Sequence, residues 1–309
     1  MIVDLCRNFY ERRTRMAKIG IVLSGCSSKV GYERGCLSAI IDYFGLDSIK
    51  CVSSASAGSF IAQAVGIGHE TELEEALRLL DSGKYGRHIL GAASNSNASP
   101  LITKVIKGGE PLKYEHYVCI WNFTKRCAEY IPFHKLKADE VLPHMLGAMS
   151  VPVVNAGVVI DGDRILDGAF VDNIPVQPLL DKDLDYIFCI YFDNKKYVFE
   201  SPEFDKKIIK LYDFPNNGRF DLLLYTPGTY DALYRYAYEY TSDVIKKVFE
   251  NEAQPDIYES IAEYERCHEA IYEPRFTADI VLNNINIMTN RYFKHSTLKK
   301  NSRQVRNTD

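Results

Sequence analysis

The chain has 309 residues, of which 46% are apolar and 25% charged, as in a folded globular protein. This length allows one large α/β domain or two smaller ones. A net charge of -4 gives no overall field that would attract nucleic acid, so we expect no nucleic-acid partner. The N-terminus lacks the apolar core of a signal peptide, and no apolar run approaches the roughly 18 residues that span a bilayer.

Eight cysteines are scattered along the chain, without a C-x-x-C pair and without a Cys/His cluster at zinc-ligand spacing. They predict reduced thiols and a cytoplasmic location, with no metal and no cofactor. Met16 stands directly before the first apolar run and offers an alternative start. We therefore expect residues 1–16 to form a disordered basic arm.

Residues 18–68 predict strand, loop, helix, strand, sharp turn and helix, in that order. The strands are expected at 18–24 and 49–53, and apolar residues recur at helical spacing after each. Such a βαβ unit sets its two strands parallel and usually adjacent. The loop after Ser24 and the turn at Ser56 should then lie together at the carboxyl edge of the sheet, where α/β proteins bind ligands.

The rest of the chain gives a mixture of clear and unclear patterns. We expect helices at 69–90, 138–150 and 230–249, a polar loop at 91–100, a β-hairpin within 153–176 and a buried strand at 185–192. Asp161-Gly162 supplies the tight turn of the hairpin. Residues 101–135 have no clear period and could form a lid. With no repeat and no linker, we predict one domain.

The stretch CVSSASAGSF at 51–60 almost matches the nucleophile motif G-x-S-x-G around Ser56. A nucleophile elbow needs small residues two places either side of the serine, because strand and helix approach closely there. Gly58 meets this need, whereas Ser54 replaces the first glycine. The same composition is typical of a small-residue turn, so the motif alone leaves both interpretations open.

Two further segments carry candidate chemistry. In the loop SGCSSKVGYERG, the backbone amides of 25–28 could bind an anion or an oxyanion, although an ordinary βα loop has the same pattern. No phosphate-binding motif is present. Asp167 follows a predicted strand and could act as a general base for a nearby serine. The alternative is an Asp-Gly turn with a solvated carboxylate.

Taken together, these segments resemble the patatin-like phospholipases. The blocks LSGCSSKVGYERGCL, VSSASAGSF and GAMSVPVVNAGVVIDGDRILDGAFVDNIPV follow the order of that family, and the last is the most specific. The resemblance covers about residues 17–192. It implies a three-layer α/β fold, with a mostly parallel central sheet flanked by helices, for a patatin-like domain that we place at 17–290.

The resemblance also implies a serine lipid acyl hydrolase, of the phospholipase A or lysophospholipase type, acting on an acyl lipid substrate. Ser56 would be the nucleophile and Asp167 its partner in a Ser-Asp dyad. The remaining residues that the resemblance assigns are the oxyanion-hole amides of Gly25, Cys26, Ser27 and Ser28, and the motif positions Lys29, Ser54, Gly58, Gly168 and Ala169.

Three departures from the family pattern leave other functions open. Cys26 and Ser27 stand where the family has glycines, and a positive φ is disfavoured there. Together with Ser54, they favour as alternatives a catalytically weak or inactive acyl-binding module, or an acyl transferase. His295 lies downstream of Ser56 and Asp167, in the order that the members of a catalytic triad have in α/β-hydrolases, but no local motif supports it. The basic tail at 291–309 suggests a peripheral contact with anionic membranes.

Overall fold

The computed structural model describes residues 17–26, 29–82, 84, 95–106, 109–152, 154–192, 195–212, 228–251, 253–267 and 271–275. Its centre is an eight-stranded sheet in the order β5-β6-β3-β2-β1-β7-β9, with β4 paired to β3. These strands are β1 (Ile19–Leu23), β2 (Ile49–Ala55), β3 (Glu115–Asn122), β4 (Cys127–Pro132), β5 (Val158–Ile160), β6 (Asp163–Asp167), β7 (Tyr186–Ile190) and β9 (Ile208–Leu211). The run from β3 to β9 is parallel, whereas β4, β5 and β6 join antiparallel.

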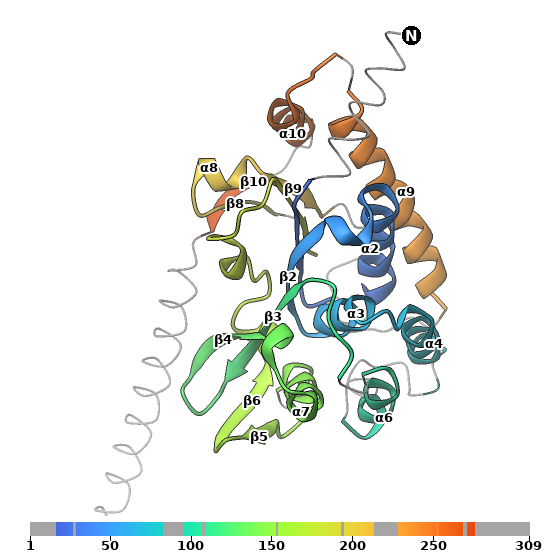
Figure 1. The fold of residues 1–309 in the computed structure, drawn as a ribbon, viewed down its shortest axis with the longest axis vertical. Coiled ribbons are helices and arrows are strands. Elements are labelled where there is room, and N and C mark those ends of the chain that lie inside the picture. Colours follow the sequence, from blue (N-terminus) through green and yellow to red (C-terminus); the bar gives the residue numbers. More distant parts are fainter. Residues whose placement is uncertain are drawn as a thin grey trace, which may run out of the picture.

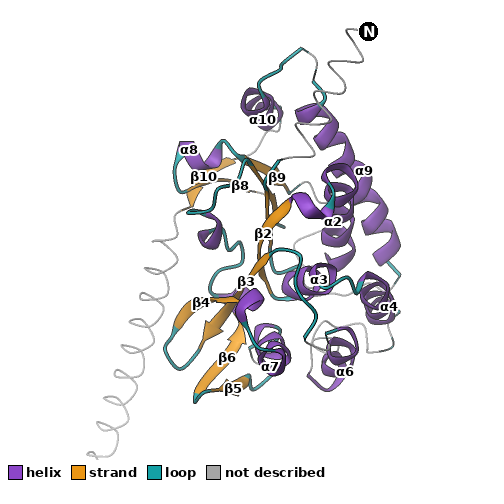
Figure 2. Cartoon of the chain, viewed as in Figure 1, coloured by secondary structure: helices purple, strands orange, loops and turns teal. Residues whose placement is uncertain are grey.

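Helices cover the sheet unequally on its two faces. The α-helices are α2 (Val30–Phe44), α3 (Ala57–Gly66), α4 (Glu70–Asp81), α6 (Asn95–Val105), α7 (Ala138–Ala148), α8 (Pro202–Asp205), α9 (Tyr230–Phe249) and α10 (Ile257–Arg266). In Figure 1, α2, α3, α4 and α9 gather on one side of the sheet. The other side carries the short α8 and a two-stranded ribbon of β8 (Lys195–Phe199) and β10 (Ile271–Arg275). Figure 2 shows α7 beside the β5–β6 end of the sheet.

Alternating side chains of the central strands explain this layering. Ile19, Ile21 and Leu23 of β1 enter the larger core on the helical side, whereas Val22 packs into the smaller core opposite. Strand β7 alternates in the same way. Because parallel strands are buried on both faces, each needs apolar residues at almost every position, as the runs IGIVL and YIFCI have.

The structure confirms the predicted βαβ unit, in which β1 and β2 pair in parallel. It also confirms the hairpin, where Asp161 and Gly162 both have positive φ at the turn between β5 and β6. The predicted mostly parallel sheet flanked by helices is likewise confirmed.

Two expectations between the helix α4 and the strand β4 are wrong. Residues 95–100 belong to α6 rather than to a polar loop, because Leu101, Ile102 and Val105 in the same helix are buried in the core. That packing outweighs the weak helix propensity of serine and asparagine. Residues 115–132 form β3 and β4 rather than a lid, and β3 is central to the sheet. The predicted arm at 1–16, the tail at 291–309 and His295 lie outside the described residues.

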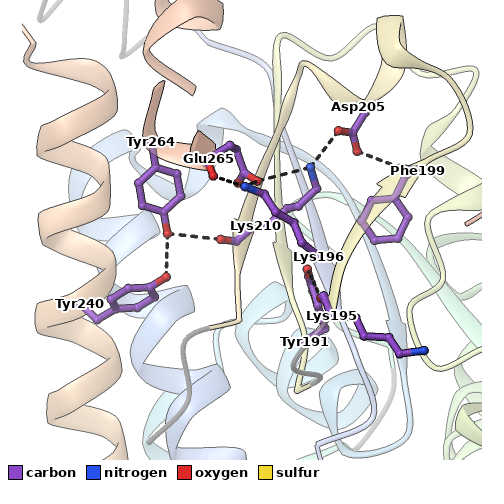
Figure 3. Close-up of polar contacts among 9 residues, drawn as sticks. All are labelled: Tyr191, Lys195, Lys196, Phe199, Asp205, Lys210, Tyr240, Tyr264 and Glu265. Atoms are coloured by element: carbon purple, nitrogen blue, oxygen red, sulfur yellow. Dashed lines mark hydrogen bonds and ion pairs between the residues drawn. The ribbon is translucent and has the colours of Figure 1, made fainter. Parts of the chain in front are cut away.

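On the side of the sheet that carries α8 and β8, a cluster of buried charged side chains reaches α10 (Figure 3). The Lys196 ammonium contacts Glu265 Oε2 at 2.9 Å and also donates to the Glu265 carbonyl. Lys210 Nζ lies 2.9 Å from Asp205 Oδ2 and 3.7 Å from Glu265 Oε2. Two ammonium groups therefore face two carboxylates, which is the condition under which buried charges are tolerated. The cluster ties β8, β9, α8 and α10 together.

No helix in the part of the chain that the structure describes is both long and apolar enough to cross a membrane.

Candidate active site

Ser56 lies between the end of β2 and the start of α3 with φ 52° and ψ -131°. A non-glycine residue rarely adopts a positive φ, because its Cβ then crowds the backbone. Such strain persists only where the surroundings hold it, and the sharp strand-to-helix elbow of serine hydrolases is one such place. The strained residue is the same serine that the sequence motif singled out.

Strand β3 sets the distance between Ser56 and Asp167. Its first half pairs with β2 and its last residues pair with β6, while β4 occupies the opposite edge. Thus β2 and β6 meet end to end along one edge of β3. Ala55 faces Cys119, and Asp167 faces the next residue, Ile120. The side chains beyond these ends consequently converge, and Ser56 Oγ donates a hydrogen bond of 2.6 Å to Asp167 Oδ2.

Asp167 is almost fully buried, with 1% of its surface exposed. Burial raises the pKa of its carboxyl from 3.8 to about 6, and hydrogen bonds from the Ser56 hydroxyl and the Ala169 amide lower it in part. The Ala169 amide donates to Oδ1 across 2.9 Å, which leaves Oδ2 to the serine. A carboxylate of this kind is ionised at neutral pH and still basic enough to accept a proton.

Two glycines are required by close contacts around this pair. A Cβ on Gly58 would lie 2.8 Å from the Ser24 carbonyl oxygen, at the crossing of α3 and the end of β1. A Cβ on Gly168 would lie 2.2 Å from the Cys119 carbonyl oxygen on β3. At both predicted glycines a neighbouring backbone segment approaches so closely that there is no room for a side chain. Ala169, the next motif position, is half-buried beside Asp167.

The loop after β1 is only partly described, since Ser27 and Ser28 lie outside the described residues. The amide of Gly25 donates to Asn173 Oδ1 across 2.9 Å and is thus engaged within the protein. Cys26 is fully buried. The Lys29 ammonium lies 5.0 Å from the ring centre of Phe192, a cation–π contact that fixes the far end of the loop.

Ser54 has a definite environment although it replaces a glycine. Its hydroxyl oxygen lies 3.0 Å from Ser59 Oγ on α3 and 2.8 Å from His116 Nε2 on β3. The side chain is fully buried. The serine at this position therefore makes hydrogen bonds to α3 and β3 that a glycine could not make.

Several residues near the pair had no role in the sequence analysis. Asn173 is one, and its signal was its place in the run DNIPV that leaves the hairpin. His116 is another, and nothing local in the sequence distinguished it from the other histidines. Glu33, at the first turn of α2, is fully buried, and its Oε2 would lie 3.0 Å from a Cβ on Gly58. Among the described histidines, none is within hydrogen-bond distance of Ser56 or Asp167.

Within the described part of the chain, no group of three or more His, Cys, Asp and Glu side chains is arranged to hold a metal ion. The described residues bring together a serine hydroxyl, a buried carboxylate and a backbone amide at the site.

Comparison with known proteins places the chain in a family. The sequence model described as patatin-like phospholipase matches residues 21–180, a range that contains both Ser56 and Asp167. The chain belongs to the patatin-like phospholipase family. No protein among the curated proteins compared matches it.

Among solved structures, the patatin-like chain is similar to the crystal structure of VipD from Legionella pneumophila. The two share 13% sequence identity with a TM-score of 0.44, over 74% of this chain and 66% of VipD. The similarity therefore spans slightly less than two thirds of the VipD chain. Family membership supports lipid acyl hydrolysis at a general level.

Proposed function

We propose that this protein hydrolyses ester bonds of acyl lipids, of the phospholipid or lysophospholipid class, with Ser56 as nucleophile and Asp167 as general base. The observation that carries the proposal is the 2.6 Å hydrogen bond from Ser56 Oγ to Asp167 Oδ2, made by a serine with strained backbone. A serine hydroxyl needs an adjacent base to become a competent nucleophile, and the carboxylate is in position to serve.

The steps follow from this geometry. Ser56 Oγ attacks the acyl carbonyl carbon while its proton passes to Asp167 Oδ2. The tetrahedral intermediate expels the alcohol of the lipid, which takes that proton, and the acyl group remains on Ser56. A water molecule then gives a proton to Asp167 and attacks the acyl-enzyme, which releases the fatty acid and returns the proton to Ser56.

Backbone amides of the loop after β1 would stabilise the oxyanion of the intermediate. Because the Gly25 amide donates to Asn173, we assign this role to Cys26 and to Ser27 and Ser28, and only secondarily to Gly25. The start of α3 directly after Ser56 adds a partial positive charge. The acyl lipid substrate, the peripheral membrane contact and the cytoplasmic location remain predictions.

The test uses purified protein, a fluorophosphonate probe and a phospholipid or p-nitrophenyl ester substrate. We expect Ser56→Ala and Asp167→Asn each to abolish hydrolysis, and Ser56→Ala to abolish labelling. The control is Ser53→Ala, which alters a fully buried serine on β2, the strand that leads to Ser56. Hydrolysis that survives both substitutions would refute the dyad. Product analysis with and without an added alcohol separates hydrolysis from acyl transfer.

One observation favours a second candidate, a non-catalytic acyl-binding module on the same fold. The Gly25 amide donates to Asn173, so an oxyanion would find one free donor fewer in this loop. Loss of one such donor can lower a rate by about 10²–10³. A protein that binds acyl lipid but shows neither labelling nor hydrolysis would establish this second candidate.

A further inference from the structure

The serine that replaces the family's first elbow glycine belongs to a connected set of buried hydrogen bonds. Ser54 on β2 contacts Ser59 on α3 at 3.0 Å and His116 on β3 at 2.8 Å. His116 Nδ1 in turn lies 3.0 Å from Gln63 Oε1, one turn after Ser59 on α3. The four side chains are therefore linked in the order Ser59, Ser54, His116 and Gln63, and the helix α3 connects the two ends; we call this set the elbow ring.

All four side chains of the elbow ring are buried, with exposures of 0% for Ser54, Ser59 and His116 and 4% for Gln63. A neutral imidazole supplies one donor and one acceptor, which suits its two partners here. Burial lowers the pKa of His116 to about 3, so the ring remains uncharged over the working pH range. Since buried polar groups are costly unless they are paired, each member depends on the others.

Two members of the elbow ring flank the strained residue in sequence. Ser54 stands two residues before Ser56, and Ser59 stands three residues after it. The Ser59 amide also donates to the Ser56 carbonyl oxygen across 2.9 Å. The strand that leads into the elbow and the helix that leaves it are thus bonded to each other. His116 attaches both to β3, the strand that also places Asp167.

We infer that Ser54, His116 and Gln63 are positioning residues that hold Ser56 in its positive-φ conformation and within reach of Asp167. A strained backbone persists only when its surroundings fix it, and a serine at position 54 provides two hydrogen bonds that a glycine could not. The serine in place of the family's glycine therefore adds hydrogen bonds to the elbow and does not weaken it. This inference rests on the proposed nucleophilic role of Ser56.

The decisive variant is Ser54→Gly, because the two explanations predict opposite signs. If the serine merely occupies a position better suited to glycine, Ser54→Gly should raise activity. If the elbow ring positions Ser56, Ser54→Gly and Ser54→Ala should each lower kcat and the rate of fluorophosphonate labelling by about 10- to 100-fold, the cost of a small misplacement of a reacting group. KM should be unchanged, because the ring does not contact substrate.

A pair of substitutions at position 116 separates positioning from packing. The terminal amide of His116→Gln reaches the place of Nε2 and can bond Ser54, so it should retain most of the rate. His116→Phe fills similar space without a hydrogen bond and should match Ser54→Ala. The two losses should not add in the double variant Ser54→Ala/His116→Phe, because both break the same contact.

Ser53→Ala serves as the matched control, since Ser53 is fully buried on β2 beside Ser54 and its hydroxyl has no hydrogen-bond partner among the described residues. Labelling and kcat that survive Ser54→Gly unchanged or increased would overturn the positioning role and leave the proposed function intact. Absence of Ser56-dependent labelling in the unaltered chain would overturn both. The folded Ser54→Ala protein could also melt at a lower temperature and keep its full kcat. That result would show that the elbow ring only stabilises the fold, and it would overturn the inference.

Discussion

Asn173 Oδ1 accepts a hydrogen bond from the Gly25 amide across 2.9 Å, which joins the loop after β1 to the segment that follows Asp167. The two partners are 148 residues apart in sequence. The bond holds the proposed oxyanion loop beside the segment that follows Asp167, and it makes Asn173 part of the candidate site.

Asn173→Ala should therefore lower kcat, by about 10-fold if the loop moves by a fraction of an ångström. The Gly25 amide would lose its acceptor, and the loop would no longer be fixed relative to Asp167. Steady-state kinetics on the ester substrate measure the effect, with circular dichroism to verify that the variant is folded. A variant with unchanged kcat would show that the loop is held by other contacts.

The activity should depend on pH through Asp167. Its carboxyl must be ionised to accept the Ser56 proton, and its pKa is raised to about 6 by burial. We expect kcat/KM to rise between pH 5 and pH 7 with a half-maximal value near pH 6, from one ionisation. A pH series with the p-nitrophenyl ester checks this. A profile that is flat down to pH 4 would contradict the raised pKa.

Glu33 should make the folded protein less stable as the pH rises. Burial raises the pKa of its carboxyl well above 4.5, so the folded protein holds a proton that the unfolded chain releases above pH 4.5. The stability that this neutral carboxyl contributes is present below pH 4.5 and is lost as the pH rises toward the folded pKa. The loss is roughly 1.4 kcal/mol for each pKa unit of difference.

Glu33→Gln keeps the shape of the side chain without the ionisation. It should therefore raise the free energy of unfolding at pH 8 and change it little at pH 4.5. Urea denaturation at the two pH values measures the difference. Equal effects at both would show that Glu33 is ionised in the folded protein.

Lys196→Met should destabilise the protein by about 3–5 kcal/mol, because it leaves the buried carboxylate of Glu265 with only the more distant Lys210. Adding Glu265→Gln should recover most of the loss, since Lys210 still pairs with Asp205 at 2.9 Å. Lys195→Met is the control, because that ammonium points away from the cluster in Figure 3. Thermal unfolding of the four proteins tests the order. If the double variant is as unstable as Lys196→Met, the unpaired charge of Glu265 is not the cause of the destabilisation.

The sequence predicted those parts of the fold that local patterns specify. The runs at 18–24 and 49–53 gave the βαβ unit, and Asp161-Gly162 gave the hairpin, because apolar periodicity and turn chemistry are local properties. The strand β3 was missed, because EHYVCIWN mixes polar and aromatic residues and owes its place to the strands on either side. Likewise, α6 depends on its packing against the core.

The same division holds at the site. Ser56 and Asp167 could be selected from motifs, since Ser56 stands in a run of small residues and Asp167 in the specific block LDGAFVDNIPV. His116, Gln63 and Asn173 could not be assigned roles, because their partners come from other strands and helices. Which amides of the loop remain free to bind an oxyanion was also beyond sequence reasoning, since the Gly25 amide is occupied by a residue from a distant segment.

The end-to-end meeting of β2 and β6 along β3 has a consequence for how the protein matures. Ser56 and Asp167 are separated by 111 residues, so a chain emerging from the ribosome contains the serine long before it contains the carboxylate. Pairing over such a separation is slow, because a long loop must close first. The nascent protein therefore carries the serine without the carboxylate that we propose as its base. If Ser56 and Asp167 act as we propose, hydrolysis of lipid begins only after the hairpin at 158–167 docks on β3.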